Sequence, residues 1–193
     1  MGDLDPDPEI WGALEGGEGL TRILTEFYTL VFDDPKLNHF FVGVTRQRAI
    51  EKQYNFLRQI FTGEKIYFGD RPRNAHHWMV ISDELFDYRE ELFASCLRRY
   101  GLAEPLIARW RRVHERFRKQ IVKDHPRPKK IRGKAIPFEG YGVVKLEVGS
   151  LCDGCAEELS VGDEARYHNR TGATYCLTCV PGRESTRPPP LAP

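Results

Sequence analysis

Four cysteines near the C-terminus, arranged as two CxxC pairs, constrain the fold of this chain more than any other feature. The pairs are Cys152 with Cys155 and Cys176 with Cys179, and a short polar segment separates them. Four thiolates at this spacing supply all the ligands of a tetrahedral zinc site, and Gly154 is expected to ease the first turn. Disulfides or redox-active pairs are the alternatives, and the doubled spacing favours zinc. A closed four-sulfur site has no open coordination position, so it predicts a structural zinc module.

Length and composition place this module beside a larger domain. The chain has 193 residues and a formal net charge of +1, which gives no general attraction to nucleic acid. No apolar run approaches the length that spans a membrane, and the acidic, proline-containing start is unlike a signal peptide. We therefore expect a cytoplasmic protein, in which reduced thiols are available to metal. Cys96, the fifth cysteine, lies on an apolar helical stripe and is expected to be a core thiol.

The pattern from Trp11 to about Lys123 is helical almost throughout, because apolar residues recur at steps of three and four. One helix contains Leu20 to Val31 and stops at Asp33–Pro35, since proline cannot continue it. The others are expected over residues 45–61, from Pro72 through His76–Met79, from the cap Ser82 to Gly101, and over residues 104–123, with Thr45 as a further cap. The first two thirds of the chain is therefore predicted to be all-helical.

The residue composition and the apolar pattern change after residues 125–128. Residues 125–140 form a basic, glycine-containing linker, and residues 141–148 alternate like a strand. Residues 164–168 and 174–175, between the two cysteine pairs, indicate a hairpin. The expected domains are residues 10–124, the linker 125–140, a β-rich zinc module over 141–182 and a disordered tail over 183–193. No aromatic residue is interleaved with the basic residues of the linker, so nucleic-acid binding is not expected.

Several short motifs in the helical region occur together in an order that resembles the truncated (two-over-two) hemoglobins, nearest their first subgroup. The motifs are Gly16-Gly17, Phe27-Tyr28, Asp34-Pro35, Phe40-Phe41, Lys52-Gln53, Phe56, Tyr67-x-Gly69 and His76-x4-Ile81-Ser82. Each motif is weak by itself, and their joint spacing is specific. The resemblance covers roughly Trp11 to Lys123 and implies a globin-like two-over-two helical sandwich that binds heme. The four-cysteine extension, which resembles a zinc ribbon, is not part of the standard family.

The resemblance also implies which residues hold the heme. His76 is the expected proximal iron ligand, and an axial imidazole leaves the opposite face open to a diatomic gas. His77 is the competing candidate, expected to point outward or toward a propionate. Tyr28 and Gln53 match the family's hydrogen-bond donors to bound ligand, although Tyr28 is otherwise read as an ordinary core aromatic. The remaining pocket residues implied by the family are Phe41, Phe27, Ala49, Phe56 and Leu57.

Arg89 departs from the family pattern, because it lies on the inward stripe of its helix three residues after Phe86. A buried unpaired guanidinium is costly, so Arg89 must be paired or reach solvent. A heme propionate, Asp87 or another carboxylate are the alternative partners. A remodelled or heme-free pocket is a further alternative. His39 and His114 have no assigned role.

Three functions are compatible with these features. The first is a heme protein that binds dioxygen, nitric oxide or carbon monoxide at the iron. Turnover of nitric oxide with dioxygen would need an external reductase, because the chain has no nucleotide or flavin motif of its own. The second is a gas sensor or adaptor, in which the zinc module contacts a protein partner. The third is a heme-free scaffold, for which Arg89 is the main support.

Overall fold

A computed structural model describes residues 5–67, 69–131 and 133–179. The chain divides into two compact units, Met1–Arg127 and Pro128–Pro193. The tail expected over residues 183–193 lies outside the described residues. Among the residues that the structure covers, no helix combines the length and the apolar character needed to cross a bilayer.

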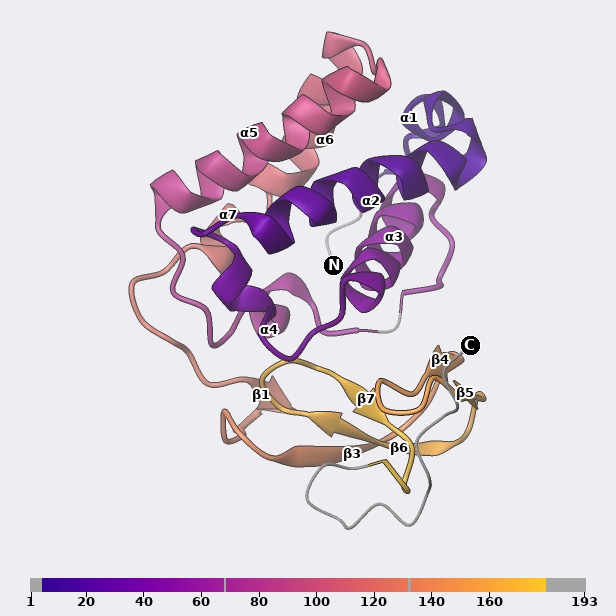
Figure 1. Cartoon of the computed structure of the whole chain (residues 1–193), viewed down its shortest axis with the longest axis vertical. Coiled ribbons are helices and arrows are strands. Elements are labelled where there is room, and N and C mark those ends of the chain that lie inside the picture. Colours follow the sequence, from indigo (N-terminus) through magenta and orange to yellow (C-terminus); the bar gives the residue numbers. More distant parts are fainter. Residues whose placement is uncertain (1–4, 68, 132, 180–193) are drawn as a thin grey trace. The chain divides into compact units, whose positions relative to one another are not determined.

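The first unit is helical (Figure 1). Its elements are α1 (Pro8–Ala13), η1 (Glu15–Gly17), α2 (Glu18–Asp33), η2 (Asn38–Phe41), α3 (Arg46–Thr62), α4 (Pro72–Ala75), α5 (Asp83–Tyr100), α6 (Glu104–Glu115) and α7 (Arg118–Ile121). Helix α2 packs against both α3 and α5, and α5 packs against α6. This arrangement confirms the globin-like helical sandwich.

The helix boundaries follow from local capping, as expected. The hydroxyl of Thr45 accepts a hydrogen bond from the amide of Arg48 at 3.2 Å, which caps α3. Ser82 caps α5 in the same way. Gly63 and Gly101 end α3 and α5 with φ angles of 78° and 94°, a left-handed conformation that side chains other than glycine rarely adopt.

Two helices are shorter than the sequence predicted. Helix α4 ends at Ala75 and does not continue through Met79, because the amide of His77 turns back three residues to the carbonyl of Asn74. The helix expected over residues 104–123 is divided into α6 and α7. There the amide of Phe117 bonds the carbonyl of His114 at 2.9 Å, again three residues back, so the helical ladder is interrupted.

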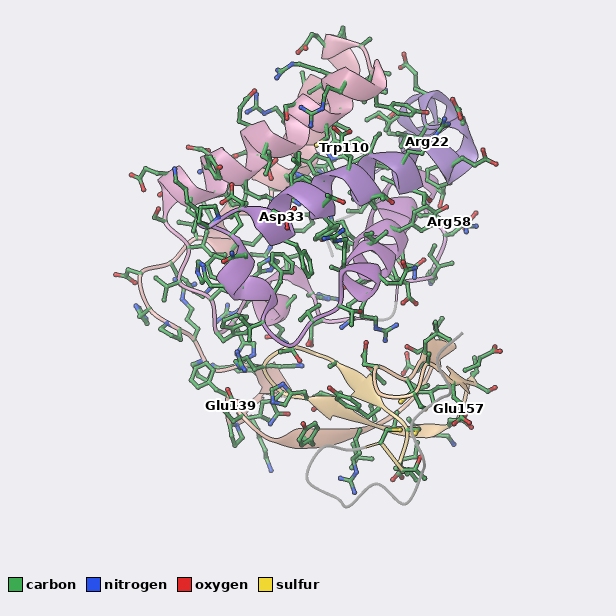
Figure 2. All side chains as sticks on the ribbon, viewed as in Figure 1. Arg22, Asp33, Arg58, Trp110, Glu139 and Glu157 are labelled. Carbon is green, nitrogen blue, oxygen red and sulfur yellow. The ribbon has the colours of Figure 1, made fainter. Side chains whose placement is uncertain are left out.

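Side chains fill the space between the helices of the first unit, and Trp110, which Figure 2 labels, belongs to an aromatic cluster there. Phe93 on α5 contacts Phe27 on α2, with ring centroids 4.6 Å apart, and Trp110 on α6, with centroids 5.4 Å apart. Phe61 on α3 also contacts Trp110, with ring centroids 4.8 Å apart. All four rings are buried, so one aromatic cluster joins α2, α3, α5 and α6. Cys96 is buried in the same core, as predicted.

The second unit is built of short antiparallel strands. A three-stranded sheet has the order β3 (Tyr141–Lys145), β6 (Glu164–His168) and β7 (Thr174–Tyr175). The predicted hairpin is present, with Arg166 opposite Tyr175, and the strand expected over 141–148 ends at Lys145. β4 (Ser150–Leu151) pairs with β5 (Glu158–Leu159), and β1 (Lys130–Ile131) pairs with β2 (Lys134–Ala135) inside the stretch expected to be a linker.

Candidate functional site

His76 is the C-cap of α4, and its side chain is fixed by the helix that precedes it. Its Nδ1 atom lies 2.9 Å from the carbonyl oxygen of Pro72, which can only accept a hydrogen bond. Nδ1 therefore carries the proton, and the lone pair of Nε2 is available to a metal. Burial lowers the pKa of His76 to about 4 against the opposing effect of the Pro72 bond, and Lys123 and Arg89 lower it further. The imidazole is consequently neutral near pH 7, as ligation requires.

Lys123 braces the loop that carries His76, a role that the sequence did not reveal. Its ammonium group donates to the carbonyl of His76 at 2.7 Å and to that of Ile121 at 3.1 Å. The backbone of Lys123 also forms an antiparallel bridge with Ile81, beyond the histidine. Burial lowers the pKa of Lys123 to about 8, helped by Arg127, so the ammonium form still predominates at pH 7. The C-terminal end of the unit thus holds both ends of the histidine loop.

His77 is buried, with 2% of its surface exposed, so the expectation that it points outward is wrong. Its carbonyl accepts a hydrogen bond from the amide of Arg127 at 2.8 Å. The side chain of His77 is therefore packed inside the helical unit. In His76, the hydrogen bond from Nδ1 to the Pro72 carbonyl leaves the lone pair of Nε2 available to a metal.

Tyr28 lies on α2 with only 6% of its surface exposed. Its ring makes edge contacts with Phe27, at a centroid distance of 5.2 Å, and with Phe41 from η2, at 5.8 Å. Burial raises the pKa of Tyr28 to about 12, and the charge of Arg89 only partly opposes this effect. The hydroxyl group therefore stays protonated and can act as a hydrogen-bond donor.

The other expected pocket residues come from α2, η2 and α3. Ala49, Gln53 and Leu57 follow one another at four-residue steps, so they share one face of α3. Ala49 and Leu57 are buried in the same core cluster as Phe27 and Tyr28, with Phe41 and Phe56 packed against its edge, while Gln53 is half-buried. The structure thus gathers these apolar residues in one cluster.

Tyr67, which follows α3, packs against the same group of pocket residues. The motif that contains Tyr67 did not predict this contact. Its ring contacts that of Phe56 at 5.2 Å, and its hydroxyl donates to the carbonyl of Asp70 at 3.0 Å. Burial raises the pKa of Tyr67, as do the charges of Asp70 and Tyr28. The two tyrosines therefore lie within electrostatic reach of each other.

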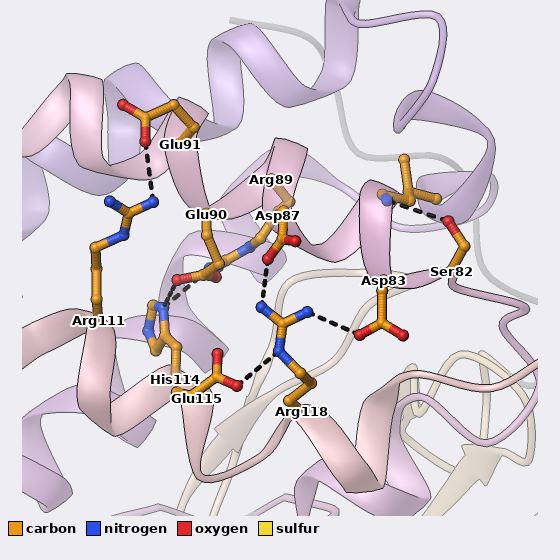
Figure 3. Close-up of polar contacts among 11 residues, drawn as sticks. Ser82, Asp83, Asp87, Arg89, Glu90, Glu91, Arg111, His114, Glu115 and Arg118 are labelled. Atoms are coloured by element: carbon orange, nitrogen blue, oxygen red, sulfur yellow. Dashed lines mark hydrogen bonds and ion pairs between the residues drawn. The ribbon is translucent and has the colours of Figure 1, made fainter.

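Arg89 is paired, but not with Asp87 (Figure 3). Its Nη1 atom donates to Oε1 of Glu90 at 2.5 Å and lies 3.2 Å from Nδ1 of His114. That Nδ1 atom is 2.8 Å from Oε2 of Glu90, and the indole of Trp110 donates to Nε2 of His114 at 3.2 Å. Because Nε2 accepts this bond, Nδ1 carries the proton and donates to Glu90. Asp87 instead pairs with Arg118.

The hydrogen bonds that link Arg89, Glu90, Trp110 and His114 give His114 a structural role, which the sequence did not suggest. Glu90 and His114 are both buried, and both carboxylate oxygens are engaged. Burial alone raises the pKa of Glu90, but the neighbouring His114 and Arg89 outweigh it and lower the pKa to about 2. Spacing gave no signal for this contact, because Glu90 and His114 are 24 residues apart on different helices.

The four cysteines of the second unit meet at one point. Their sulfur atoms all lie within 4.8 Å of one another, and the Sγ atoms of Cys155 and Cys176 are 3.9 Å apart. A zinc–sulfur distance of about 2.3 Å gives a tetrahedron with sulfur–sulfur edges of about 3.8 Å. The arrangement therefore fits a metal better than a disulfide, and none of the cysteines is disulfide-bonded.

Hydrogen bonds to sulfur prepare this cluster for a cation. The amides of Gly154 and Cys176 both lie 3.3 Å from the sulfur of Cys152. Burial raises the pKa of Cys176, but hydrogen bonds led by the one from Thr178 outweigh it and lower the pKa to about 6. The Glu157 amide lowers the pKa of Cys155, yet burial and the other sulfurs raise it to about 12. Without a cation the four thiols do not ionise together, because their negative charges repel.

Gly154 has a different role from the one expected. Its backbone is not left-handed, and the residue of this loop with a positive φ angle is Ala156, at 58°. A Cβ atom added at Gly154 would lie 2.8 Å from Cβ of Cys179. Glycine is therefore required by the close approach of the two cysteine loops, and not by the dihedral angles of a turn.

Comparison with known proteins identifies the first unit. The family described as bacterial-like globin matches residues 9–123, so the chain belongs to this family. Within it, the chain is similar to group 1 truncated hemoglobins. It is 26% identical over 115 residues to the protein of Tetrahymena thermophila, which covers 60% of this chain and 95% of the relative. It is 32% identical over 105 residues to GlbN of Synechocystis, covering 51% of this chain and 83% of the relative.

Solved structures agree with this assignment. The crystal structure of the truncated hemoglobin from Tetrahymena pyriformis in its Fe(III) form matches with a TM-score of 0.55 and 26% identity, covering 60% of this chain and 98% of that one. Variants of the same hemoglobin, with one tyrosine or one of two glutamines replaced, match at TM-scores of 0.55. The recognition of a group 1 truncated hemoglobin with a four-cysteine extension is thus confirmed, and heme is implied.

Proposed function

We propose that the first unit binds heme through Nε2 of His76 and reversibly binds dioxygen at the iron. The observation that supports this most strongly is the hydrogen bond from Nδ1 of His76 to the carbonyl of Pro72 at 2.9 Å. This bond orients the ring, fixes the tautomer and raises the basicity of the ligating nitrogen. Heme supplies an iron that takes a diatomic gas, including nitric oxide and carbon monoxide, in its open position.

Tyr28 and Gln53 are the proposed hydrogen-bond donors to this ligand. In the Tetrahymena pyriformis hemoglobin, the two glutamines replaced in the variant structures follow the replaced tyrosine by 21 and 25 residues. The same intervals from Tyr28 lead to Ala49 and Gln53. Ala49 cannot donate from its side chain, so Tyr28 carries more of the ligand stabilisation here. Phe27, Phe41, Phe56 and Leu57 exclude water, which strengthens each remaining hydrogen bond.

The chain supplies no electron donor of its own that the sequence or the comparisons identify. The proposal therefore includes the conversion of nitric oxide with dioxygen only if an external reductase supplies the electrons. Reversible oxygen binding needs no such partner, and it is the function that the residues support most directly. The proposed location is the cytoplasm, where the cysteines stay reduced.

Cys152, Cys155, Cys176 and Cys179 are proposed to hold one structural zinc ion. Four thiolates close the coordination sphere, so the ion stabilises the fold and performs no chemistry. The small core of this unit supports the need for a metal, because few apolar residues besides Leu146, Leu159 and Ala165 are buried among its described residues. Replacing Cys152 with serine should release zinc and unfold the second unit while the heme spectrum persists.

A gas sensor is the second candidate function. The observation that favours it is the separate compact unit that follows the globin, which a simple oxygen carrier does not need. Hydrogen exchange of residues 133–179 with and without carbon monoxide distinguishes the two. Exchange that changes with the gas supports a sensor, whereas identical exchange supports a carrier.

The proposed heme ligation is tested by comparing His76→Ala with His77→Ala. The two residues are adjacent, so His77→Ala is a matched control for the packing of this segment. We expect His76→Ala to lose heme on gel filtration and to regain a five-coordinate spectrum with added imidazole. His77→Ala should retain heme. The reverse result would show that the register of the ligand is wrong by one residue.

A further inference from the structure

Arg89 places a positive charge on the inner face of α5. It lies three residues after Phe86 and four before Phe93, and both of these rings are buried. Its guanidinium carbon is 4.8 Å from the ring centroid of Phe27 and 5.0 Å from that of Phe93. Phe27 in turn contacts Tyr28, the proposed ligand donor, at 5.2 Å. The charge therefore lies over the aromatic pair beside this tyrosine.

The guanidinium group of Arg89 is held through one of its nitrogen atoms, Nη1. Both of its polar side-chain contacts in the described part of the chain involve Nη1, which meets Glu90 and His114. The bond from Trp110 to His114 holds the imidazole, and the imidazole holds the carboxylate. A side chain fixed through Nη1 keeps the donors of Nη2 and Nε in a defined direction. Because Glu90 and His114 hold the side chain of Arg89 in one conformation, Arg89 loses little rotamer freedom when a ligand binds to it.

Arg89 also lies beside one of the residues proposed to contact the heme ligand. Its guanidinium covers the ring of Phe27, a proposed pocket residue that contacts Tyr28. The side chain of Arg89 is 25% exposed and that of its partner Glu90 is 8% exposed, so water screens the charge of the guanidinium only partly.

We propose that Arg89 is a ligand-specificity residue of the heme site, which selects small anions such as fluoride, azide or nitrite. This inference rests on the proposed heme binding. The guanidinium donates a charge-assisted hydrogen bond to an anion at the iron, while a neutral ligand gains nothing comparable. Glu90 and His114 are positioning residues, which hold Arg89 and do not touch the ligand.

The test is titration of the full-length ferric heme protein with fluoride and, separately, with imidazole. Arg89→Leu removes the charge, and Arg89→Gln removes it while keeping a polar side chain that can bond Glu90. Arg98→Leu is the matched control, because Arg98 is on the same helix, is exposed and pairs with Glu91 and Glu104. The absorption spectrum reports binding in each case.

We expect fluoride binding to weaken roughly tenfold or more in both Arg89 variants, as for loss of a hydrogen bond to a charged group. Imidazole binding and the Arg98→Leu protein should change less than about twofold. Equal fluoride affinity in wild type and in either heme-retaining Arg89 variant would overturn the inference, as would an equal loss of imidazole binding. A wild-type protein that takes up no heme would instead refute the proposed function itself.

Discussion

Replacing Glu90 with glutamine should destabilise the helical unit strongly and in a pH-dependent way. The side chain of Glu90 is buried and accepts hydrogen bonds from Arg89 and His114. Glutamine has the same shape but no charge, and its amide nitrogen cannot accept either bond. The substitution leaves the guanidinium of Arg89 without its counter-charge, and this loss is the main cause of the expected effect.

The size of the effect follows from the pKa of Glu90, which is lowered from 4.5 to about 2 in the folded protein. Each pH unit of difference corresponds to about 1.4 kcal/mol, so the ionised carboxylate contributes roughly 3 kcal/mol at pH 7. Because the folded pKa lies below the unfolded value, this stabilisation is present above pH 4.5. It is lost as the pH falls toward 2, and roughly half of it remains at pH 3.

Urea denaturation followed by far-ultraviolet circular dichroism measures this difference, because the helices lie in the first unit. Glu91→Gln is the matched control, since the neighbouring side chain is 58% exposed and its ion pairs with Arg98 and Arg111 lie at the surface. The control should lose less than about 1 kcal/mol. A Glu90→Gln loss no larger than that of the control, or one that is the same at pH 7 and pH 3, would refute the reasoning.

Three further predictions concern the two sites. Tyr28→Phe should release dioxygen about tenfold faster in stopped-flow experiments, because one hydrogen bond to the ligand is lost; an unchanged rate would mean that Tyr28 is only a core residue. Lys123→Met should speed heme transfer to apomyoglobin several-fold with little change in helix content, because the carbonyl of His76 loses its ammonium donor; unchanged transfer would contradict the bracing role. Gly154→Ala should lower zinc affinity, measured by competition with a chelator, because the added methyl meets Cys179; unchanged affinity would show that the loops can separate.

The features predicted correctly from the sequence are those that depend on neighbours along the chain. Thr45 and Ser82 cap their helices through amides three residues away, and Gly101 ends α5 through its own dihedral angles. The spacing inside each CxxC pair is also a local signal, and the doubled pair predicts one cluster of four sulfur atoms, which the structure confirms. Such signals need no knowledge of the tertiary fold.

The features that the sequence did not predict depend on contacts between distant segments. Lys123 reaches the carbonyl of His76 across 47 residues, and no periodicity marks that contact. For Arg89 the sequence leaves several partners open, among them a nearby carboxylate, and the structure selects Glu90. The contact with His114 on α6 has no signal in the sequence, because it depends on the packing of the two helices. The early end of α4 coincides with contacts of the same kind, because the carbonyls of His76 and His77 accept hydrogen bonds from Lys123 and Arg127 at the end of the unit.

The absorption spectrum of the wild-type protein tests the central claim most directly. The full-length protein is expressed with ample heme, reduced and then exposed to air. The proposed function predicts a Soret band that shifts reversibly with oxygen and that is absent from His76→Ala but retained in His77→Ala. No Soret band in the wild-type protein, even after heme is added, would contradict heme binding and leave the helical unit a scaffold without a gas ligand.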